Sequence, residues 1–441
     1  MRRDPLIIGA GPAGTAAAIT LARAGCCPIM IERASGPTDK VCGDFLSIDA
    51  IRRAQALGVD PASLGAAPIR YVRLIHRERV AQAALPFPAM GLSRRGFDAA
   101  LLRHAQSVGA ILRGGQTVRQ LAREVAPPAA APSANAALAR VPLATSRLAT
   151  TFPATAPVAG APEAFAVLRA GRLDPAAATC QANAPPAAAP GQWTARTADQ
   201  TAFSADTVFL ATGKHDLRDL PRPRTDRGAV GMKMYFALAP DAARMLGDAI
   251  ELTLFPGGYA GMQPVENGQA VLCIAIQRQA LLRHGGTWAT LLVRIQQHSR
   301  RFSALLAGAR ALLARPLAIA GVPYGYRSDA LAAPGLFRLG DQAAVIPSLT
   351  GDGMAIALHS GASAAEAWLA GADSTAYHRA LARTLRRQMR LAGLLHHACM
   401  TGSVQAAITQ AAALFPALLH QAANRTRLAS PQAPSGQPTG A

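Results

Sequence analysis

Two short apolar runs flank a helix-forming stretch near the start of the chain. Residues 6–8 and 28–31 are almost entirely aliphatic, which is typical of buried parallel strands. The Ala- and Leu-rich stretch between them ends at Gly25 and predicts a helix. The sequence therefore predicts a strand–helix–strand unit over residues 6–32.

The turn between the first strand and the helix reads Gly-Ala-Gly-Pro-Ala-Gly. Gly9 permits the sharp turn, Gly11 lets a phosphate approach the backbone, and Gly14 lets the helix pack closely on the strand. The helix N-terminus offers free N–H groups to that phosphate. Glu32, after the second strand, is placed to accept hydrogen bonds from a ribose and to repel a 2′-phosphate. We predict a dinucleotide site that takes FAD or NAD rather than NADP.

The loop after this unit carries Lys40, Cys42, Gly43 and Asp44. Ligands bind at the carboxyl ends of parallel strands, so this loop is a candidate part of the site. Cys42 could contact a flavin or a substrate, although a single cysteine more often fills space in a core. A chain that otherwise uses arginine has only three lysines, which indicates either a need for a compact charge or chance.

Further periodic segments extend this first region. The pattern predicts a helix over 48–57, a strand over 69–76, and strands over 109–112 and 117–121. Ser93 is placed to cap another helix, in which Arg94 would either hold a pyrophosphate or be a solvated surface residue. Residues 124–190 are dominated by Ala, Pro, Ser and Thr, from which we expect a largely disordered insertion with a short helix near 162–168.

Order returns with strands at 193–197 and 205–213, the second of which ends in Thr212-Gly213. From residue 230 the period changes to that of an antiparallel sheet. Turns at Pro256-Gly257-Gly258 and at Glu266-Asn267-Gly268 join its strands. A long helix pair is expected over 281–306. The expected strands of this sheet are 230–238, 249–255, 259–264 and 270–277.

A late strand ends in Gly340-Asp341 and is followed by the Thr350–Gly353 bend and a helix over 355–369. Such a strand would place a carboxylate beside a polyol, and the helix N-terminus would stabilise negative charge on a reduced flavin. This late return favours FAD over NAD. Amphipathic helices over 375–394 and 404–423 come next, and they could form a lid, an interface or a membrane-surface contact. The tail after residue 430 is expected to be frayed.

The formal net charge of +20 changes this interpretation little. The basic residues are mostly arginines spread thinly through the chain, so we expect no nucleic-acid partner. The six cysteines lack the spacing of a zinc site, and we expect no bound metal. Because no signal peptide precedes the first strand and no apolar span is long enough to cross a bilayer, we expect a cytoplasmic protein.

With these motifs placed, the chain resembles the FAD-dependent oxidoreductases of the para-hydroxybenzoate-hydroxylase fold, and within them the geranylgeranyl-reductase-like branch. The resemblance covers residues 6–121 and 194–369. It implies that Gly9, Gly11, Gly14 and Glu32 hold the ADP half of FAD, and that Arg94 matches the arginine of the Arg-x-x-Phe-Asp segment near the cofactor.

The later motifs carry the same resemblance. Asp341 matches the aspartate that holds the ribityl chain, and residues 351–354 match the helix start at the isoalloxazine. Lys-Val-Cys-Gly at 40–43 and the small-residue pattern at 360–366 look like the reductase branch.

The chain also departs from each branch of that family. Hydroxylases carry Asp-Gly where this chain has Thr212-Gly213, and a histidine near Val345. Reductases carry Tyr-x-Trp-x-Phe-Pro where residues 259–264 read Tyr-Ala-Gly-Met-Gln-Pro. The Trp-x-Trp-x-x-Pro motif of halogenases is absent from the sequence. Neither the donor docking of hydroxylases nor the isoprenoid pocket of reductases therefore carries over directly.

We therefore predict an α/β protein with a Rossmann-like FAD-binding domain, a second, mostly antiparallel β substrate domain, and C-terminal helices. The FAD-binding domain is expected in three parts, 1–123 (with an excursion at 69–91 to the substrate domain), 191–226 and 331–372. The insertion takes 124–190, the substrate domain 227–330, the C-terminal helices 373–429 and the tail 430–441.

The candidate catalytic or pocket residues are Cys42 and Lys233, and no metal ligands are expected. The candidate cofactor-binding residues are Gly9, Gly11, Pro12, Ala13, Gly14, Glu32, Arg33, Cys42, Gly43, Arg94, Thr212, Gly213, Gly340, Asp341, Pro347, Gly351, Asp352, Gly353 and Met354.

From these motifs and this resemblance we expect an FAD-dependent oxidoreductase with NAD(P)H as the electron donor. Hydroxylation of an aromatic or polyketide-like lipophilic substrate is slightly favoured. Reduction of double bonds in isoprenoids or other alkenes is the alternative. A non-catalytic FAD-binding protein is the alternative of another class.

Overall fold

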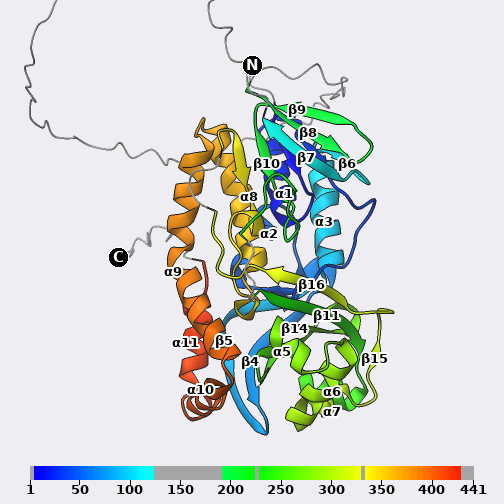
Figure 1. Cartoon of the computed structure of the whole chain (residues 1–441), viewed down its shortest axis with the longest axis vertical. Helices are drawn as coiled ribbons and strands as arrows, with labels where there is room; N and C mark the ends of the chain where they lie inside the picture. The colour runs from blue at the N-terminus through cyan, green and yellow to red at the C-terminus, as the bar shows by residue number, and fades with distance from the viewer. Residues whose placement is uncertain (1–3, 124–190, 224–227, 329–332, 429–441) are drawn as a thin grey trace, which may run out of the picture. The chain divides into compact units, whose positions relative to one another are not determined.

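The computed structural model describes residues 4–123, 191–223, 228–328 and 333–428 (Figure 1). The predicted insertion at 124–190, with its short helix, and the predicted tail at 430–441 lie outside these residues. The described chain contains two large sheets and one small sheet. The predicted α/β class, with a Rossmann-like unit, a mostly antiparallel second sheet and C-terminal helices, is confirmed.

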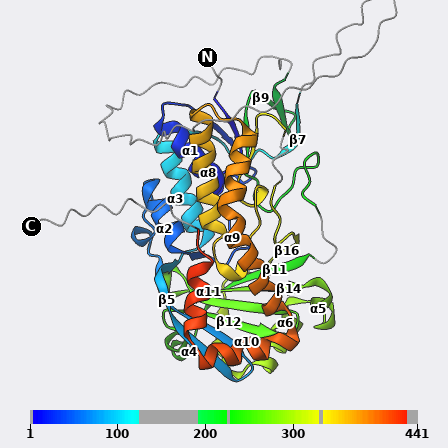
Figure 2. The same ribbon diagram turned by 90° about the vertical axis from the view of Figure 1, so that its left-hand side faces the viewer.

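Sheet A is a five-stranded parallel sheet in the order β17-β10-β1-β2-β6. Its strands are short and almost wholly apolar because layers of structure cover both faces of the sheet. Helix α1 packs against both α3 and α8 beside this sheet (Figure 2). The elements are β1 (Leu6–Ile8), β2 (Ile29–Ile31), β6 (Ile111–Arg113), β10 (Val208–Leu210), β17 (Leu336–Arg338), α1 (Pro12–Arg23), α3 (Arg94–Ser107) and α8 (Gly353–Leu369).

Glycines set the close approach of α1 to its neighbours. A Cβ at Gly14 would lie 1.9 Å from the carbonyl oxygen of Gly9, and a Cβ at Gly361 would lie 2.1 Å from that of Ala13. Neither position accepts a larger residue without moving the backbone. This packing fixes the N-terminus of α1 at the carboxyl edge of sheet A.

Sheet B has the order β15-β11-β14-β13-β12-β4-β5-β3, with β16 paired to β11. All its pairs are antiparallel except β4–β12. The strands are β3 (Phe45–Leu46), β4 (Ala67–His76), β5 (Arg79–Gly91), β11 (Ala229–Ala237), β12 (Ala249–Phe255), β13 (Gly258–Pro264), β14 (Ala270–Gln277), β15 (Arg310–Ala311) and β16 (Leu317–Val322).

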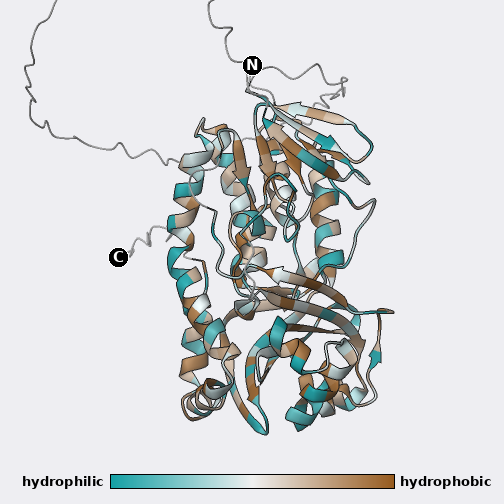
Figure 3. Cartoon of the chain, in the orientation of Figure 1, coloured by the Kyte–Doolittle hydropathy of each residue, from teal (hydrophilic) through white to brown (hydrophobic). Residues whose placement is uncertain are grey.

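The two faces of sheet B have different partners. Side chains such as Met232 and Met234 pack on four helices. These are α4 (Pro240–Leu246), α5 (Arg278–Arg283), α6 (Trp288–His298) and α7 (Arg300–Leu306). Tyr259 and Ala275 face the other way and pack with Cys399 of the C-terminal helices. Figure 3 shows many of the sheet B residues in the brown of apolar side chains. The period-2 alternation of the strands therefore divides the sheet between a helical core and a second layer.

The helix pair predicted over 281–306 is wrong in number. The segment forms three short helices, α5 (Arg278–Arg283), α6 (Trp288–His298) and α7 (Arg300–Leu306). Gly285 and Gly286, both at positive φ, end the first helix, and Thr287 begins the second with a capping box. These local signals outweigh the helical periodicity of the flanking residues.

The C-terminal helices also differ from the prediction. The first, α9, runs from Ser374 to Met400 and is longer than expected. The second is broken into α10 (Gly402–Leu414) and α11 (Ala417–Arg425), because Pro416 cannot continue the hydrogen bonding of a helix. The helix axis bends by 108° between α10 and α11. Within the described residues no single helix is long and apolar enough to cross a membrane. The bent pair α10 and α11 reaches that length and apolar composition only when its two helices are taken together.

The remaining elements complete the described chain. Helix α2 covers much of the predicted helix at 48–57, and the predicted strand at 193–197 is confirmed as β8. This strand pairs with its two neighbours in a small antiparallel sheet. The elements are α2 (Ile48–Ala56), β7 (Val118–Arg123), β8 (Trp193–Thr197), β9 (Ala202–Ala205) and the short 3₁₀ turns η1 (Ala62–Leu64), η2 (Glu266–Gly268), η3 (Gly340–Gln342) and η4 (Ser348–Thr350).

Candidate functional site

A cavity of about 1720 Å³ lies against the carboxyl edge of sheet A. This volume exceeds the usual range of about 300–1,000 Å³ for a small-molecule site, so it has room for a dinucleotide and a second ligand. One part is lined by the loops that leave β1, β2, β10 and β17. The other part, here called the apolar arm, is lined by β4, β5 and β12 and by α9, α10 and α11.

The glycine turn before α1 has the shape that a pyrophosphate requires. Gly9 adopts φ +102°, and a Cβ there would lie 2.4 Å from the carbonyl oxygen of Ala211. A Cβ at Gly11 would meet only the Arg94 Nη2, at 3.7 Å, so this glycine leaves open space towards the cavity. Gly11 is the N-cap of α1 and has no side chain, so no side chain competes with an anion for the first N–H groups.

Glu32 closes β2 at the edge of the same cavity. Its Oε2 accepts from the backbone N–H of Ala10 at 2.8 Å, and its Oε1 accepts from that of Ala34 at 3.1 Å. Each carboxylate oxygen can accept more than one hydrogen bond, so both keep capacity for ribose hydroxyls. Arg33 also lines the cavity, and its Nη2 lies 2.8 Å from the His215 Nε2.

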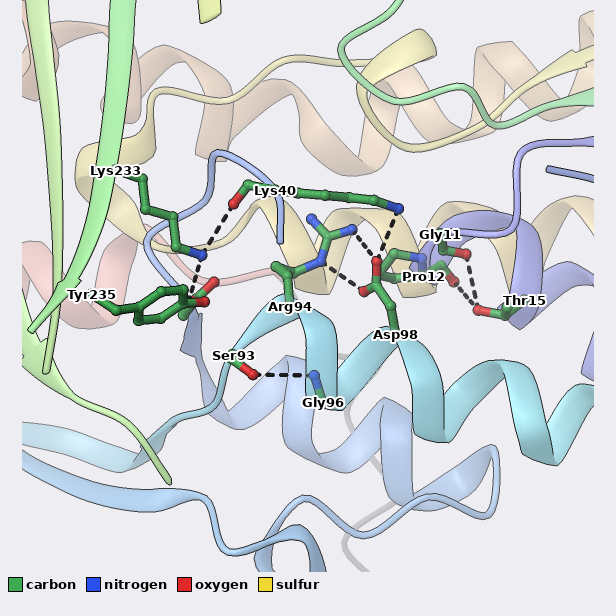
Figure 4. A network of polar contacts seen from close by, with 11 residues as sticks. Gly11, Pro12, Thr15, Lys40, Ser93, Arg94, Gly96, Asp98, Lys233 and Tyr235 are labelled. Carbon is green, nitrogen blue, oxygen red and sulfur yellow. Dashed lines mark hydrogen bonds and ion pairs between the residues drawn. The ribbon is translucent and has the colours of Figure 1, made fainter. Parts of the chain in front are cut away.

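Arg94 lies at the start of α3 and faces the start of α1 (Figure 4). Its Nε and Nη2 donate to the two carboxylate oxygens of Asp98 at 2.7 and 2.8 Å, and Lys40 approaches the same carboxylate at 3.3 Å. Burial alone would lower the pKa of Arg94, but the Asp98 charge outweighs burial and raises it. The guanidinium is therefore a fixed, oriented positive charge beside Gly11.

The late segment brings Asp341 to this cavity. Its Oδ2 accepts from the Lys214 Nζ at 3.0 Å, and Arg222 donates to its backbone oxygen at 2.8 Å. Burial would raise the pKa of Asp341, but the Lys214 ammonium outweighs it, so the pKa lies below its usual value. An ionised carboxylate is the acceptor that a polyol chain needs. The neighbouring Gln342 ties the loop of Gly213 to the same place, with its Nε2 2.9 Å from the Gly213 oxygen.

The bend before α8 also lines the cavity. Gly351 adopts φ +72°, and a Cβ there would lie 2.5 Å from the ring of Phe45. Gly353 and Met354 line the cavity at the N-terminus of α8, where backbone N–H groups and the positive helix dipole can stabilise an anionic ring. Asp352 points elsewhere, because Arg427 and Gln388 hold its carboxylate.

The structure thus brings three distant chain segments to one cavity. Three predicted residues do not line it: Gly14 and Pro347 support the turns, and Asp352 is buried behind them. The predicted cofactor-binding residues that do line it are Gly9, Gly11, Pro12, Ala13, Glu32, Arg33, Cys42, Gly43, Arg94, Thr212, Gly213, Gly340, Asp341, Gly351, Gly353 and Met354.

The two predicted catalytic residues have different positions. Cys42 carries a free thiol and lines the cavity, so its proposed role stays a prediction. Lys233 does not line the cavity, which corrects its assignment as a pocket residue. Its ammonium is fully buried, 2.7 Å from the Asp44 Oδ2 and 3.0 Å from the carbonyl oxygen of Lys40. Tyr235 donates to the same Asp44 oxygen at 2.6 Å.

Sequence reasoning missed several cavity residues. Lys214 follows the Thr-Gly turn in a loop whose composition gave no direction for its side chain. Tyr259, Tyr324 and Ser348 come from three separate segments and meet through their hydroxyl groups. Local patterns carry no signal for such a meeting, because it depends on how sheet B sits against the late loop.

These observations fit an FAD-binding site, and the comparison with known families decides the point. Residues 2–130 match the family model described as "FAD binding domain". The chain contains an FAD-binding domain. Two curated relatives match a short piece of it. Menaquinone reductase of Mycolicibacterium smegmatis is 47% identical over 58 residues, and that of Mycobacterium tuberculosis is 46% identical over 56 residues. These matches span 13% of this chain and 14% of each relative.

Several solved structures resemble this chain over nearly its full length, although their sequence identity to it is low. A Pseudomonas aeruginosa PqsL variant matches with a TM-score of 0.64 at 16% identity, over 93% of this chain and 100% of that one. A geranylgeranyl bacteriochlorophyll reductase-like protein from Thermoplasma acidophilum matches at 0.65 and 16%, over 96% of both chains. The flavin-dependent brominase Bmp2 matches at 0.66 and 14%, over 96% of this chain and 93% of that one. The chain therefore has the fold that these three proteins share.

Proposed function

We propose that this protein is an FAD-dependent oxidoreductase that acts on an elongated, apolar small molecule. The observation that carries the proposal is the apolar arm, which continues the cavity beyond the FAD-binding residues. Its walls are almost entirely aliphatic or aromatic, which favours a lipophilic substrate. Representative lining residues are Leu74, Leu85, Phe87, Leu252, Leu395 and Leu419.

The side chains around the cavity suggest how the protein would hold and orient its cofactor. The backbone at Gly11 and the Arg94 guanidinium would bind the pyrophosphate, and Glu32 would bind the adenosine ribose. Asp341, kept ionised by Lys214, would accept from the ribityl hydroxyls. FAD, when bound, supplies two-electron redox chemistry. The N-terminus of α8 would stabilise negative charge at the ring, and the apolar walls would exclude water from the substrate.

Two reactions fit this arrangement, and we place reduction of a double bond first. The apolar lining of the arm and the local similarity to two menaquinone reductases favour a lipid-like substrate such as a quinone with a prenyl tail. Hydroxylation is the second candidate. It is supported by the similarity in fold to PqsL, which has been solved in complex with 2-aminobenzoylacetate.

Anaerobic reduction of the purified holoprotein separates these reactions. If the protein is a reductase, flavin that has been reduced with dithionite is re-oxidised by menaquinone in the absence of air, and the two electrons and two hydrogens appear in one saturated double bond of the prenyl tail, which mass spectrometry detects. If it is a hydroxylase, the double bonds of the prenyl tail stay unchanged, and 2-aminobenzoylacetate speeds oxygen consumption once air is admitted. A bound flavin that responds to neither compound contradicts the proposed substrate class. A yellow protein whose flavin no donor can reduce supports the alternative of a non-catalytic FAD-binding protein.

We propose NAD(P)H as the electron donor. Arg119, Arg196 and Arg218 are exposed and line the same cavity, so they offer positive charge to the phosphates of a second nucleotide. Anaerobic bleaching of the flavin at 450 nm (about the usual flavin absorption maximum) by NADH or NADPH tests this proposal. No bleaching by either nucleotide, with full bleaching by dithionite, contradicts it.

We further propose that the bend between α10 and α11 contacts an anionic lipid surface. Leu414, Phe415 and Leu418 at this bend are 62%, 64% and 47% exposed, and Leu418 also lines the apolar arm. The arm and the exposed apolar bend are therefore continuous, which would let a lipid substrate pass between the surface and the cavity. On α9, Arg390 and Leu394 are both exposed and one turn apart, so a basic and an apolar side chain share one face of that helix.

Vesicle co-sedimentation tests the lipid contact. We expect the holoprotein to bind vesicles that contain phosphatidylserine, and Phe415→Ser to weaken this binding. Leu282→Ser is the matched control, because Leu282 is 66% exposed but lies on α5. Equal binding by the two variants contradicts a specific contact at the bend. The cytoplasmic location and the absence of a nucleic-acid partner stay predictions.

A further inference from the structure

Three hydroxyl groups from separate segments meet at the wall of the cavity. The Ser348 Oγ lies 2.7 Å from the Tyr259 hydroxyl and 3.0 Å from the Tyr324 hydroxyl. All three residues line the cavity. Tyr259 comes from β13, Tyr324 from the segment after β16, and Ser348 from η4. None of these hydroxyl groups is among those proposed to hold FAD.

A count of hydrogens shows that the cluster is incomplete. Three hydroxyls carry three hydrogens and share two hydrogen bonds. In the described part of the chain they make no other side-chain hydrogen bond. Whichever group donates in each pair, one hydrogen is left without an acceptor. The cluster is therefore able to donate one hydrogen bond into the cavity.

The surroundings of the cluster keep it uncharged. Burial raises the pKa of Tyr259 well above its ordinary value and also raises the pKa of Tyr324, so both remain phenols. The His396 ring packs edge-on against both tyrosines, with centroids 6.0 and 5.0 Å away. Burial lowers the pKa of His396 to about 4, so the imidazole is neutral near pH 7. A neutral donor set suits a neutral oxygen more than an anion or a metal ion.

The position of the cluster fixes which part of a ligand it would contact. Ser348 lies three residues before Gly351, whose bend opens α8 beside the FAD-binding residues. On its other side, Leu349 and Cys399 pack in the core that joins sheet B to the C-terminal helices. The hydroxyls thus lie where the cofactor part of the cavity meets the apolar arm, which is where the reacting end of a lipophilic substrate would be placed.

We infer that Tyr259, Ser348 and Tyr324 form a subsite that binds a carbonyl or phenolic oxygen of the substrate. The inference rests on the proposed function and makes it more specific: the substrate is an apolar molecule with a neutral oxygen at its reacting end. An aliphatic hydrocarbon without oxygen would leave the unused hydrogen buried without a partner, which disfavours its binding.

Titration of the oxidised holoprotein with two probes of the same ring shape tests the subsite. The probes are 1,4-naphthoquinone, which has carbonyl oxygens, and naphthalene, which has none. Dissociation constants are measured from the change in the visible spectrum of the bound flavin. By the count above, any single substitution leaves at least one free hydroxyl hydrogen. We therefore expect the variant that combines Tyr259→Phe, Tyr324→Phe and Ser348→Ala to weaken naphthoquinone binding about three- to tenfold, the value of one hydrogen bond, with naphthalene binding unchanged.

Tyr326→Phe is the matched control, because Tyr326 lies two residues from Tyr324 but does not line the cavity. It is expected to change neither dissociation constant. A full complement of FAD in each variant shows that the site is folded. The inference is overturned if the wild type binds the two probes equally, if the triple variant binds naphthoquinone as tightly as the wild type, or if it weakens the binding of both probes to the same extent. Each of these results leaves the proposed redox function standing, since reduction of the flavin and its re-oxidation by menaquinone are measured separately.

Discussion

Replacement of Lys233 by methionine gives a sharp test of how the loop at residues 38–46 is held in place. The Lys233–Asp44 ion pair joins this loop to β11, and the side chains of both residues are fully buried. Asp44 also adopts a positive φ of 56° and accepts from Tyr235. Because Cys42 and Gly43 lie in the same loop and line the cavity, the ion pair also sets the wall of the cofactor site.

The size of the effect follows from burial. Methionine fills a similar volume but leaves the Asp44 carboxylate without its counter-charge. Removal of one partner of a buried ion pair costs about 3–5 kcal/mol, whereas replacing both partners is much milder. We therefore expect Lys233→Met to lower the free energy of unfolding by about 3–5 kcal/mol, and Asp44→Asn combined with Lys233→Met to recover most of that loss.

The pH dependence of this loss has a defined sign. Burial raises the pKa of Asp44, and Lys233 and Tyr235 partly oppose the rise. Without Lys233 the pKa of Asp44 rises further. A carboxyl group with a raised pKa in the folded state contributes stability that is fully present below its unfolded pKa and is lost as pH rises through its folded pKa. The gap between Lys233→Met and the wild type is therefore expected to be wider at pH 8 than at pH 5.

Urea unfolding of the holoprotein, followed by tryptophan fluorescence at both pH values, measures these effects. Arg244→Ala is the control, because its ion pair with Asp241 is largely exposed and such pairs contribute less than about 1 kcal/mol. The reasoning is refuted if Lys233→Met is no more destabilising than Arg244→Ala. It is refuted equally if the double variant is as unstable as the sum of its two single variants.

Three further outcomes can be checked. Gly11→Ala is expected to fold normally but to weaken FAD binding about tenfold or more, because its methyl group occupies the space left for the pyrophosphate. Fluorescence titration with FAD measures this, and Gly36→Ala is the control because its new Cβ would have no neighbour within 4 Å. Gly351→Ala is expected to lose about 1–3 kcal/mol in urea unfolding, since φ is +72° and the new Cβ would meet the Phe45 ring at 2.5 Å. Burial raises the pKa of Asp352 to about 6, so the stability that its protonated form contributes is lost as pH rises from about 4 to about 6. We expect Asp352→Asn to flatten the curve of unfolding free energy against pH in that range. An unchanged slope contradicts the raised pKa of Asp352.

The sequence by itself determined the elements whose causes are local. The glycine turn at Gly9–Gly14 is readable because only glycine accepts the positive φ at one position and the close packing at another. The strands at 249–255 and 270–277 match β12 and β14 at both ends, since their apolar runs are bounded by clear turn residues. Local competition between signals explains the errors: Pro416 and the Gly285-Gly286 pair divide segments whose periodicity looks continuous.

Only the tertiary structure decided how distant groups meet. Alternation along β11 places Lys233 on the same face as Gly231, which lines the cavity, but the loop of Lys40 and Asp44 covers the ammonium and keeps it from lining the cavity. Tyr259, Tyr324 and Ser348 form one hydroxyl cluster although up to 89 residues separate them. Side-chain direction and long-range contact depend on strand register and on how one layer packs against another. Short sequence patterns do not encode these quantities, because each pattern reports only the conformation of its own neighbourhood.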